Sequence, residues 1–223
     1  MQDRAINFFS FRVQKEKARQ SASLCYHLVK NTCFFRCNMV SKSPTITDAE
    51  LIRLSCQNPE LGFERNADGT LVTMAPIGSI SANRELKAGA RLLYWVEQNG
   101  LGEVFSSSGG FKLANSAVRS PDVAFVARER LPSGWQERED EFLDLAPDFV
   151  IEIRSKTDSL SKLKRKMEEY RENGVKLGWL IDRHNKQAFV YRQDGTITCY
   201  PENAILSGED VVPGFTLALE ILL

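Results

Sequence analysis

The sequence predicts an α/β domain built on a central mixed β-sheet that is flanked by helices. Two segments, over about 80–98 and 159–173, place apolar residues at helical spacing. Short apolar runs that are typical of strands lie between these segments and after the second one. The 223 residues show no internal repeat, and 43% of them are hydrophobic, which is enough for one sizeable core.

The first expected elements are a helix and a strand joined by a turn. Thr47 and Glu50 have the spacing of a capping box, which predicts the start of a helix. Residues 66–69 (Asn-Ala-Asp-Gly) predict a turn into a strand over 70–75. For the helix over 80–98, we expect the buried face to contain Leu86, Ala90, Leu93 and Val96.

The second half of the chain predicts most of the sheet. We expect further strands over 103–106, 111–113, 122–127, 148–153, 177–182, 187–192 and 196–200. Asp194 and Gly195 predict a hairpin between the last two strands. In the helix over 159–173, the expected buried residues are Leu160, Leu163, Met167 and Tyr170.

The first 38 residues differ from the rest, because they lack helical or strand periodicity and hold seven Lys/Arg against two Asp/Glu. We therefore predict an extraneous or disordered leader over 1–38 and a globular domain over 39–223. A basic arm that binds nucleic acid is the alternative for the leader. Since the whole chain is formally neutral, the domain carries a net charge of −5. Any surface of the domain that binds nucleic acid must therefore be local.

The five cysteines do not predict a disulfide framework, because their number is odd and no secretory signal precedes them. A zinc site made of Cys25, His27, Cys33 and Cys37 would lack the usual paired spacing. A run of ~18 apolar residues, which a membrane helix needs, does not occur in the sequence. We expect a cytoplasmic protein without a membrane span.

Two of the predicted apolar strands contain an acidic residue. Asp122 begins one of them, and Glu152 lies within the apolar run of the other. Residues at alternate positions share one face of a strand, so Asp148, Glu152 and Arg154 are expected on the same face. A buried glutamate is costly unless it is paired or binds a cation. The alternatives to a functional site are a structural ion pair between Glu152 and Arg154 or a solvated sheet face.

The spacing of these carboxylates favours one pair for metal binding. Mg²⁺ takes oxygen ligands at ~2.1 Å, so its carboxylates must lie close together. Asp148 and Glu152 are about 13 Å apart along an extended strand, whereas neighbouring strands lie ~4.8 Å apart. The geometry therefore favours Asp122 with Glu152 over Asp148 with Glu152.

Four segments carry a resemblance to a known family: 68–76, 119–126, 147–155 and 166–182. Together they resemble the PD-(D/E)XK nuclease superfamily, and within it a bacterial family described as restriction endonucleases. The resemblance extends from about Thr45 to the C-terminus. It implies a restriction endonuclease-like fold, Mg²⁺ or Mn²⁺ held by carboxylates, and a lysine that positions the attacking water and counters the charge on phosphorus.

By this resemblance, Asp122 and Glu152 are the expected metal ligands. Glu64 is expected to complete the metal site, with a surface acid beside a turn as its alternative. The position of the motif lysine is occupied by Arg154, which stays protonated and cannot act as a base. The resemblance transfers the role of the lysine to Lys166 and leaves Arg154 to orient Glu152 or a phosphate.

Other lysines compete for the same role. Lys156 lies four residues after Glu152, and the helical wheel alone does not favour Lys166 over Lys164. The alternative for each of these lysines is a solvated helix face. Residues 154–186 hold ten Lys/Arg against five Asp/Glu, which is a local basic strip that could meet a phosphate backbone.

Two classes of function remain open from the sequence. The first is a metal-dependent endonuclease that hydrolyses DNA. The second is a catalytically inactive nuclease-fold protein that binds nucleic acid or acts as a dimeric interaction module. The resemblance also implies a homodimer, by analogy with the fold. A serine hydrolase or phosphate-loop protein is disfavoured, because residues 106–110 match neither motif and the chain has two histidines.

Overall fold

The computed structural model describes residues 45–74, 76–138 and 141–223. The predicted leader over 1–38 and the predicted start of the domain at Met39 lie outside these residues. That boundary therefore stays a prediction.

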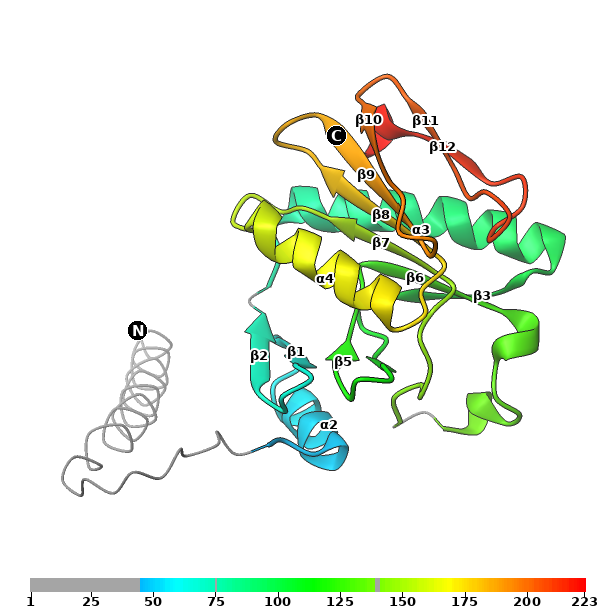
Figure 1. Cartoon of the computed structure of the whole chain (residues 1–223). Coiled ribbons are helices and arrows are strands. Elements are labelled where there is room, and N and C mark those ends of the chain that lie inside the picture. The colour runs from blue at the N-terminus through cyan, green and yellow to red at the C-terminus, as the bar shows by residue number, and fades with distance from the viewer. Residues whose placement is uncertain (1–44, 75, 139–140) are drawn as a thin grey trace, which may run out of the picture. The chain divides into compact units, whose positions relative to one another are not determined.

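The centre of the fold is a mixed six-stranded sheet with the strand order β10-β9-β8-β7-β6-β3 (Figure 1). The strands β7 and β8 run parallel, and the other neighbouring pairs run antiparallel. Where the sequence predicted these strands, its bounds agree with the structure to within one residue. The six strands are β3 (Gly102–Ser106), β6 (Val123–Ala127), β7 (Phe149–Ile153), β8 (Leu177–Asp182), β9 (Gln187–Arg192) and β10 (Ile197–Pro201).

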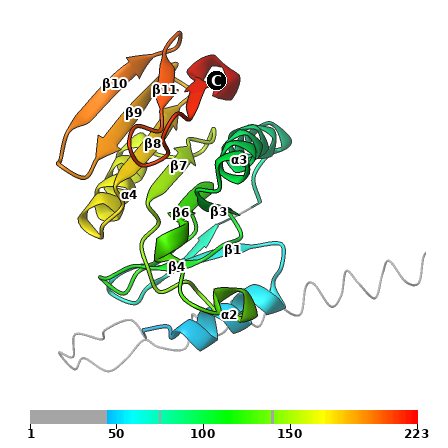
Figure 2. The ribbon, with the colours of Figure 1, turned by 90° about the vertical axis from the view of Figure 1, so that its right-hand side faces the viewer.

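Two helices cover opposite faces of this sheet, α3 (Ser79–Asn99) and α4 (Leu160–Glu172) (Figure 2). The burial of β7 explains the arrangement, because its alternate residues belong to different buried clusters. Phe149 and Ile151 pack with the inward side of α3. Val150 packs with Met167 and Tyr170 of α4. The predicted α/β class with a central mixed sheet flanked by helices is confirmed.

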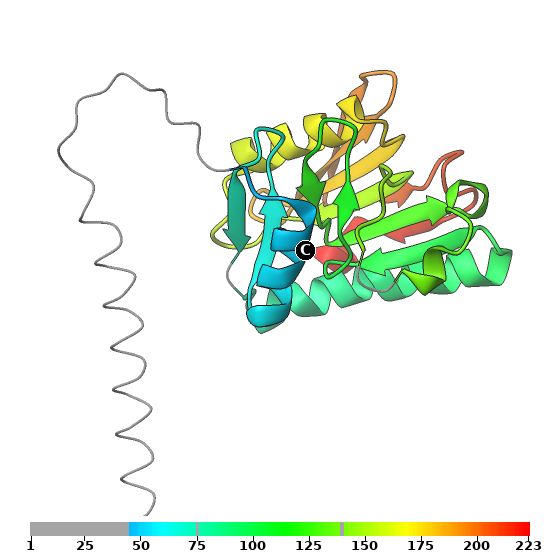
Figure 3. The ribbon, with the colours of Figure 1, turned by 90° about the horizontal axis from the view of Figure 1, so that it is seen from below.

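A smaller sheet with the order β2-β1-β5-β4 packs beside α2 (Asp48–Gln57) (Figure 3). The predicted capping box begins α2: the backbone N–H of Glu50 donates to Thr47 Oγ1 at 3.3 Å, and that of Thr47 donates to Glu50 Oε2 at 2.9 Å. The sequence missed β1 and β5. The strands of this sheet are β1 (Gly62–Arg65), β2 (Leu71–Met74), β4 (Phe111–Lys112) and β5 (Val118–Arg119).

The remaining elements are short. A hairpin of β11 (Ile205–Ser207) and β12 (Thr216–Ala218) is followed by the 3₁₀ helix η3 (Leu219–Leu222). Two further 3₁₀ turns, η1 (Arg128–Arg130) and η2 (Trp135–Glu137), lie between β6 and β7. Among the described helices, none is long and apolar enough to cross a membrane.

Of the four residues predicted for the buried face of α3, Val96 alone is buried. Leu86 is 68% exposed and Leu93 is 39% exposed. The helix instead turns the face with Ala88 and Leu92 toward the sheet, where both pack in the cluster of Phe149 and Ile151. The buried residues of α3 are Ser81, Ala88, Leu92 and Val96.

Candidate active site

Asp122 and Glu152 are brought together by the pairing of two strands. The antiparallel register pairs Val123 with Ile151, so Asp122, directly before β6, lies beside Glu152 on β7. The carboxylate of Asp122 is fixed because the backbone N–H of Ile153 donates to its Oδ2 at 2.7 Å. The predicted placement of these two acids on neighbouring strands is confirmed.

Lys166 reaches the same place from α4. Its Nζ lies 2.8 Å from Glu152 Oε1 and 2.9 Å from Glu64 Oε1. The helix packs over the sheet through Met167 and Tyr170, and this packing directs Lys166 toward β7. The hydroxyl of Tyr170 also donates to Glu152 Oε1, at 2.9 Å. Glu152 and Glu64, two of the acids proposed from the sequence, therefore both contact the ammonium group of Lys166.

Glu64 is buried in β1, with 4% of its surface exposed, so the alternative of a surface acid is wrong. Its Oε1 accepts the backbone N–H of Ser120 at 3.0 Å in addition to the ammonium of Lys166. Its Oε2 lies 3.3 Å from Arg119 Nη1. Both oxygens of Glu64 are therefore occupied by protein donors.

Arg119 extends this network away from the sheet. Its Nε lies 2.6 Å from Glu169 Oε2, and its Nη2 donates to Asn66 Oδ1 at 3.0 Å. Charges of alternating sign thus follow one another in the order Glu169, Arg119, Glu64, Lys166 and Glu152. No role was predicted for Arg119, although it directly precedes the Ser-Pro-Asp segment that contains Asp122.

The competing cations lie elsewhere. Arg154 Nη1 lies 2.8 Å from Asp182 Oδ1, and its Nε donates to the carbonyl of Asp158 at 3.1 Å. The ammonium of Lys164 lies 3.9 Å from the centre of the Phe189 ring. Lys156 is exposed in a turn. Within the described part of the chain, neither a hydrogen bond nor an ion pair joins Arg154, Lys156 or Lys164 to Glu152.

Asp148 has a structural environment. It is 1% exposed, and its Oδ1 lies 2.9 Å from Arg130 Nη1 and 2.8 Å from Lys176 Nζ. The backbone N–H of Ala127 donates to its Oδ2 at 2.9 Å. Its surroundings agree with the strand geometry that favoured Asp122 over Asp148 as the partner of Glu152.

Glu85 is an acid of the site that the sequence analysis missed. It lies on α3, and the hydroxyl of Ser107 donates to its Oε2 at 3.4 Å. Burial raises the pKa of Glu85, and the charge of Glu152 raises it further. No spacing or motif distinguishes Glu85 from the other polar residues of α3, so only the packing of the helix reveals it.

The acids of the site are crowded, and their pKa values reflect it. Burial raises the pKa of Asp122 well above its usual range, and the charges of Glu152 and Glu85 raise it further. Burial also raises the pKa of Glu152; Lys166 counters this effect, and Glu64 adds to it. Such an accumulation of negative charge favours a bound cation.

Lys166 is held as an ammonium ion. Burial alone would lower its pKa, but the charges of Glu152 and Glu64 outweigh burial and hold the pKa well above its usual value. Burial would likewise raise the pKa of Glu64, yet Lys166 and Arg119 hold it below its usual value. In this arrangement Lys166 can stabilise negative charge but does not offer a free amine as a base.

The oxygen donors fit a magnesium site completed by water and substrate. The described residues contain no group of three or more His, Cys, Asp and Glu side chains suited to holding a metal. Asp122 Oδ1 and Glu152 Oε2 have no hydrogen-bond partner among these residues, and neither belongs to the fully buried polar atoms that lack one. Mg²⁺ is commonly bound by one or two carboxylates, several waters and substrate phosphates. Two accessible carboxylate oxygens on paired strands match that pattern.

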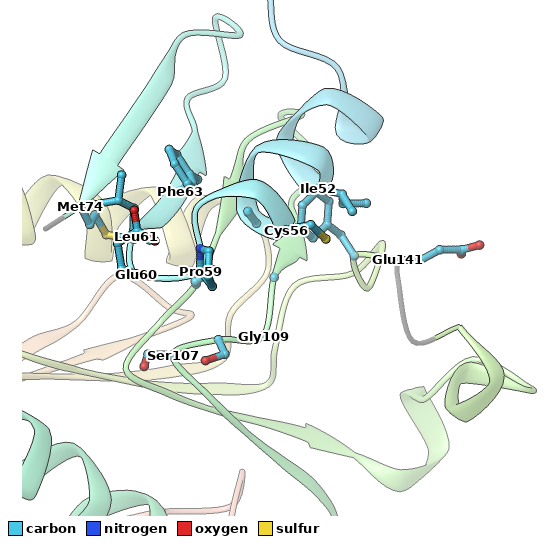
Figure 4. A pocket seen from close by; sticks show the side chains of 16 residues that line it. Ile52, Cys56, Pro59, Glu60, Leu61, Phe63, Met74, Ser107, Gly109 and Glu141 are labelled. Atoms are coloured by element: carbon cyan, nitrogen blue, oxygen red, sulfur yellow. The ribbon is translucent and has the colours of Figure 1, made fainter. Parts of the chain in front are cut away.

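Two hollows flank these residues. One, of about 560 Å³, lies between α2, β1 and the loop over 107–110; Ile52, Phe63 and Ser107 are among its lining residues (Figure 4). Ser120, whose N–H holds Glu64, is also in its wall. The other hollow, of about 380 Å³, contains Asp122 and shares Ser107 with the first. Asp122 is therefore open to one of these two hollows.

A mixed α/β core with two carboxylates on paired strands and a lysine from the following helix defines a restriction endonuclease-like protein. Residues 48–220 match the Uma2 family, described as "Putative restriction endonuclease", and the chain belongs to this family. The predicted membership in the restriction endonuclease-like superfamily is confirmed.

A solved structure of similar fold is the crystal structure of "a putative nuclease belonging to DUF820" from Anabaena variabilis ATCC 29413. It superposes with a TM-score of 0.63 at 19% identity, and the match covers 72% of this chain and 89% of that chain. This likeness shows the shared fold. No curated protein matches the chain.

Proposed function

We propose that this protein is a divalent-metal-dependent endonuclease that hydrolyses phosphodiester bonds of DNA. The observation that carries the proposal is the meeting of Asp122 and Glu152, each with one accessible and unpartnered oxygen, beside the ammonium of Lys166. The restriction endonuclease-like family and the nuclease description of the structural neighbour support the same class of reaction.

Asp122 Oδ1 and Glu152 Oε2 are the atoms that would hold Mg²⁺ or Mn²⁺. A cation bound there would polarise the phosphate and lower the pKa of a coordinated water. The hydrogen bond from the N–H of Ile153 orients Asp122, and those from Tyr170 and Lys166 orient Glu152. Each carboxylate is thus held by one oxygen and offers the other.

Lys166 would supply positive charge. In hydrolysis, a water oxygen forms a new bond to phosphorus while the bond from phosphorus to one sugar oxygen breaks, and that oxygen takes up a proton. Negative charge increases on the phosphate oxygens as this occurs, and a nearby ammonium stabilises it. Because its pKa is held high, Lys166 is better suited to this role than to removing the proton of the water.

Glu64 and Arg154 take supporting places in this proposal. Both oxygens of Glu64 face donors of the protein. We therefore propose that Glu64 positions Lys166 and does not act as the third metal ligand that was predicted. The contacts of Arg154 with Asp182 and Asp158 do not favour a role in orienting Glu152. Its predicted contact with a phosphate stays a prediction.

A second candidate function is a catalytically inactive module that binds nucleic acid or forms a homodimer. The net charge of −5 over residues 39–223 and the arginine at the motif position favour it. One assay distinguishes the two functions: it follows the conversion of supercoiled plasmid DNA to nicked or linear forms in Mg²⁺ or Mn²⁺.

For the endonuclease, the wild type converts the plasmid, and EDTA, Asp122→Asn or Glu152→Gln stops the conversion. If the wild type leaves the plasmid intact across a range of metals and pH, the endonuclease is excluded and the binding module is favoured. Equal cleavage by the wild type and both variants would instead show that another site, or a contaminant, is responsible.

A further inference from the structure

The hollow that contains Asp122 also has walls from α3 and β3. We call it the α3 groove and define it by Leu86, Gly89 and Leu93 of α3, Val104 and Phe105 of β3, and Asp122. Its volume is about 380 Å³, which is within the range of pockets that hold small ligands. Asp122 is thus both a member of the candidate active site and part of the groove wall.

The lining of the α3 groove differs from that of a phosphate site. Its walls include no lysine or arginine among the described residues, and most of the lining side chains are apolar. The polar side chains in it are those of Glu85, Ser106, Ser107 and Asp122. A phosphate would meet carboxylates here without a counter-charge, whereas the face of a nucleobase can pack on apolar walls.

Gly89 widens the groove without being required by the fold. A Cβ atom at this position would meet Val123 Cγ2 at 3.7 Å, which is an ordinary contact. Glycine in the middle of a helix lowers stability relative to alanine. The packing of α3 on the sheet therefore leaves room for a small side chain at position 89. Because Gly89 has no side chain, the helix backbone is exposed to the groove at this point.

We propose that the α3 groove receives the base of an unpaired nucleotide next to the scissile phosphate, so that the preferred substrate is single-stranded or locally unpaired DNA. This inference rests on the proposed function, because it is the phosphate at Asp122 that brings its nucleoside to the adjoining walls. A base in a duplex is stacked and presents only its edges in the grooves. A base must leave the stack before its face can contact the side chains of a protein groove.

A second copy of the chain is the competing occupant. Leu86 and Leu93 belong to a wider set of exposed apolar residues on or near α3, which also includes Ile77, Ile80 and Tyr94. A protein helix seated in the groove would cover Asp122 and Glu85 and remove both carboxylates from water without adding a cation. Such burial is costly, so the groove itself favours the nucleotide.

Binding of a fluorescein-labelled oligonucleotide tests the inference without requiring cleavage of the DNA. The labelled strand is titrated alone and as a blunt duplex, in Ca²⁺, with the wild type, Gly89→Leu and Asn83→Leu. Asn83 is exposed on α3 outside the groove, so Asn83→Leu adds the same side chain at a position that does not line the groove. We expect the wild type to prefer the single strand about tenfold, Asn83→Leu to keep this preference, and Gly89→Leu to lose it.

Leu86→Gln provides a second variant in case Gly89→Leu does not fold. Leu86 is 68% exposed, so the fold tolerates its change, and a polar side chain in the wall should also weaken binding of the single strand. The inference is overturned if folded Gly89→Leu or Leu86→Gln binds the single strand as the wild type does.

The inference is also overturned if these variants change the oligomeric state of the free protein in light scattering, because the groove is then a protein interface. Cleavage of duplex plasmid by the wild type, without any preference for the single strand, would overturn the groove inference and leave the proposed function intact. If the wild type neither binds nor cleaves DNA, the proposed function fails as well.

Discussion

The ammonium group of Lys166 on α4 lies 2.8 Å from Oε1 of Glu152 on β7. This contact holds one oxygen of the carboxylate and leaves Oε2 accessible beside Asp122. The same ammonium is held by Glu64, so the position of Lys166 depends on the small sheet as well as on the central one. The site is therefore assembled from three parts of the chain, and each part can be tested separately.

Asp122→Asn should raise the melting temperature of the metal-free protein at neutral pH. The pKa of Asp122 is raised by burial and by the charge of Glu152, so the folded state holds this proton more tightly than the unfolded state does. Stability is thus lost as pH rises from ~4 through the folded pKa, and asparagine removes this loss. Thermal unfolding in EDTA at a series of pH values checks the gain, which should grow with pH.

The same variant should lose its stabilisation by Mg²⁺ or Mn²⁺. A ligand that binds only the folded state raises stability with its concentration, so the wild type should unfold at a higher temperature as metal is added. Asp122→Asn and Glu152→Gln should show little change. Equal metal-induced shifts in the wild type and both variants would place the metal elsewhere.

Glu64→Gln should separate the positioning of Lys166 from metal binding. Both oxygens of Glu64 contact protein donors, so the variant should keep most of the metal-induced rise in melting temperature. Loss of its charge should loosen Lys166 and lower the rate of cleavage by roughly 10- to 100-fold. If the metal-induced shift disappears as completely as in Glu152→Gln, Glu64 is a metal ligand after all.

Asp148→Asn should act on stability alone. Burial would raise the pKa of Asp148, but the N–H of Ala127, Lys176 and Arg130 hold it below its usual value. Its contribution to stability is therefore present above pH ~4 and is lost as pH falls through the folded pKa. We expect a loss of roughly 2 kcal/mol at neutral pH, which is less than the ~3–5 kcal/mol typical of breaking a buried ion pair, because both cations are partly exposed.

Chemical denaturation of Asp148→Asn near neutral pH and in acid checks this dependence, and the difference from the wild type should shrink in acid. The variant should keep its metal-induced stabilisation. Loss of that stabilisation with little loss of stability would assign the metal to Asp148.

Gly89→Ala should stabilise the free protein by about 0.5–1 kcal/mol. A Cβ atom there meets Val123 Cγ2 at an ordinary 3.7 Å, so the gain in helix propensity is not offset by a clash. Urea denaturation measures the change, with Gly208→Ala as a contrast, because a Cβ at Gly208 would meet the backbone carbonyl oxygen of Val212 at 2.5 Å. A loss of stability in Gly89→Ala would mean that packing in the fold requires this glycine.

The sequence predicted the central sheet well because β6, β7 and β8 are apolar runs and a clear turn at Asp194 and Gly195 separates β9 from β10. It missed β1, since the two buried residues of this four-residue strand, Glu64 and Arg65, are charged and leave no apolar alternation. On α3 it placed Val96 correctly in the core but misplaced the rest of the buried face. Apolar residues occupy two overlapping stripes of that helix, and the stripe with Ala88 and Leu92 packs on the sheet while Leu86 and Leu93 remain outside.

The site was predictable to the extent that it depends on strand geometry. The nearness of Asp122 and Glu152 follows from the pleat and spacing of neighbouring strands, and the structure confirms it. The place of Lys166 came from resemblance, since the helical wheel could not separate it from Lys164. Glu85 and Arg119 were missed because their contacts depend on tertiary packing that no local pattern encodes.

The identity of the catalytic cation tests the central claim most directly. Plasmid cleavage in Mn²⁺ is compared for the wild type, Lys166→Gln and Arg154→Lys, with metal-induced thermal shifts as the control for folding and metal binding. We predict that Lys166→Gln keeps the thermal shift but cleaves roughly 100- to 1,000-fold more slowly, because charge stabilisation at the phosphate is lost. Arg154→Lys should cleave at least as well as the wild type. Undiminished cleavage by folded Lys166→Gln, together with an inactive Arg154→Lys, would contradict the account.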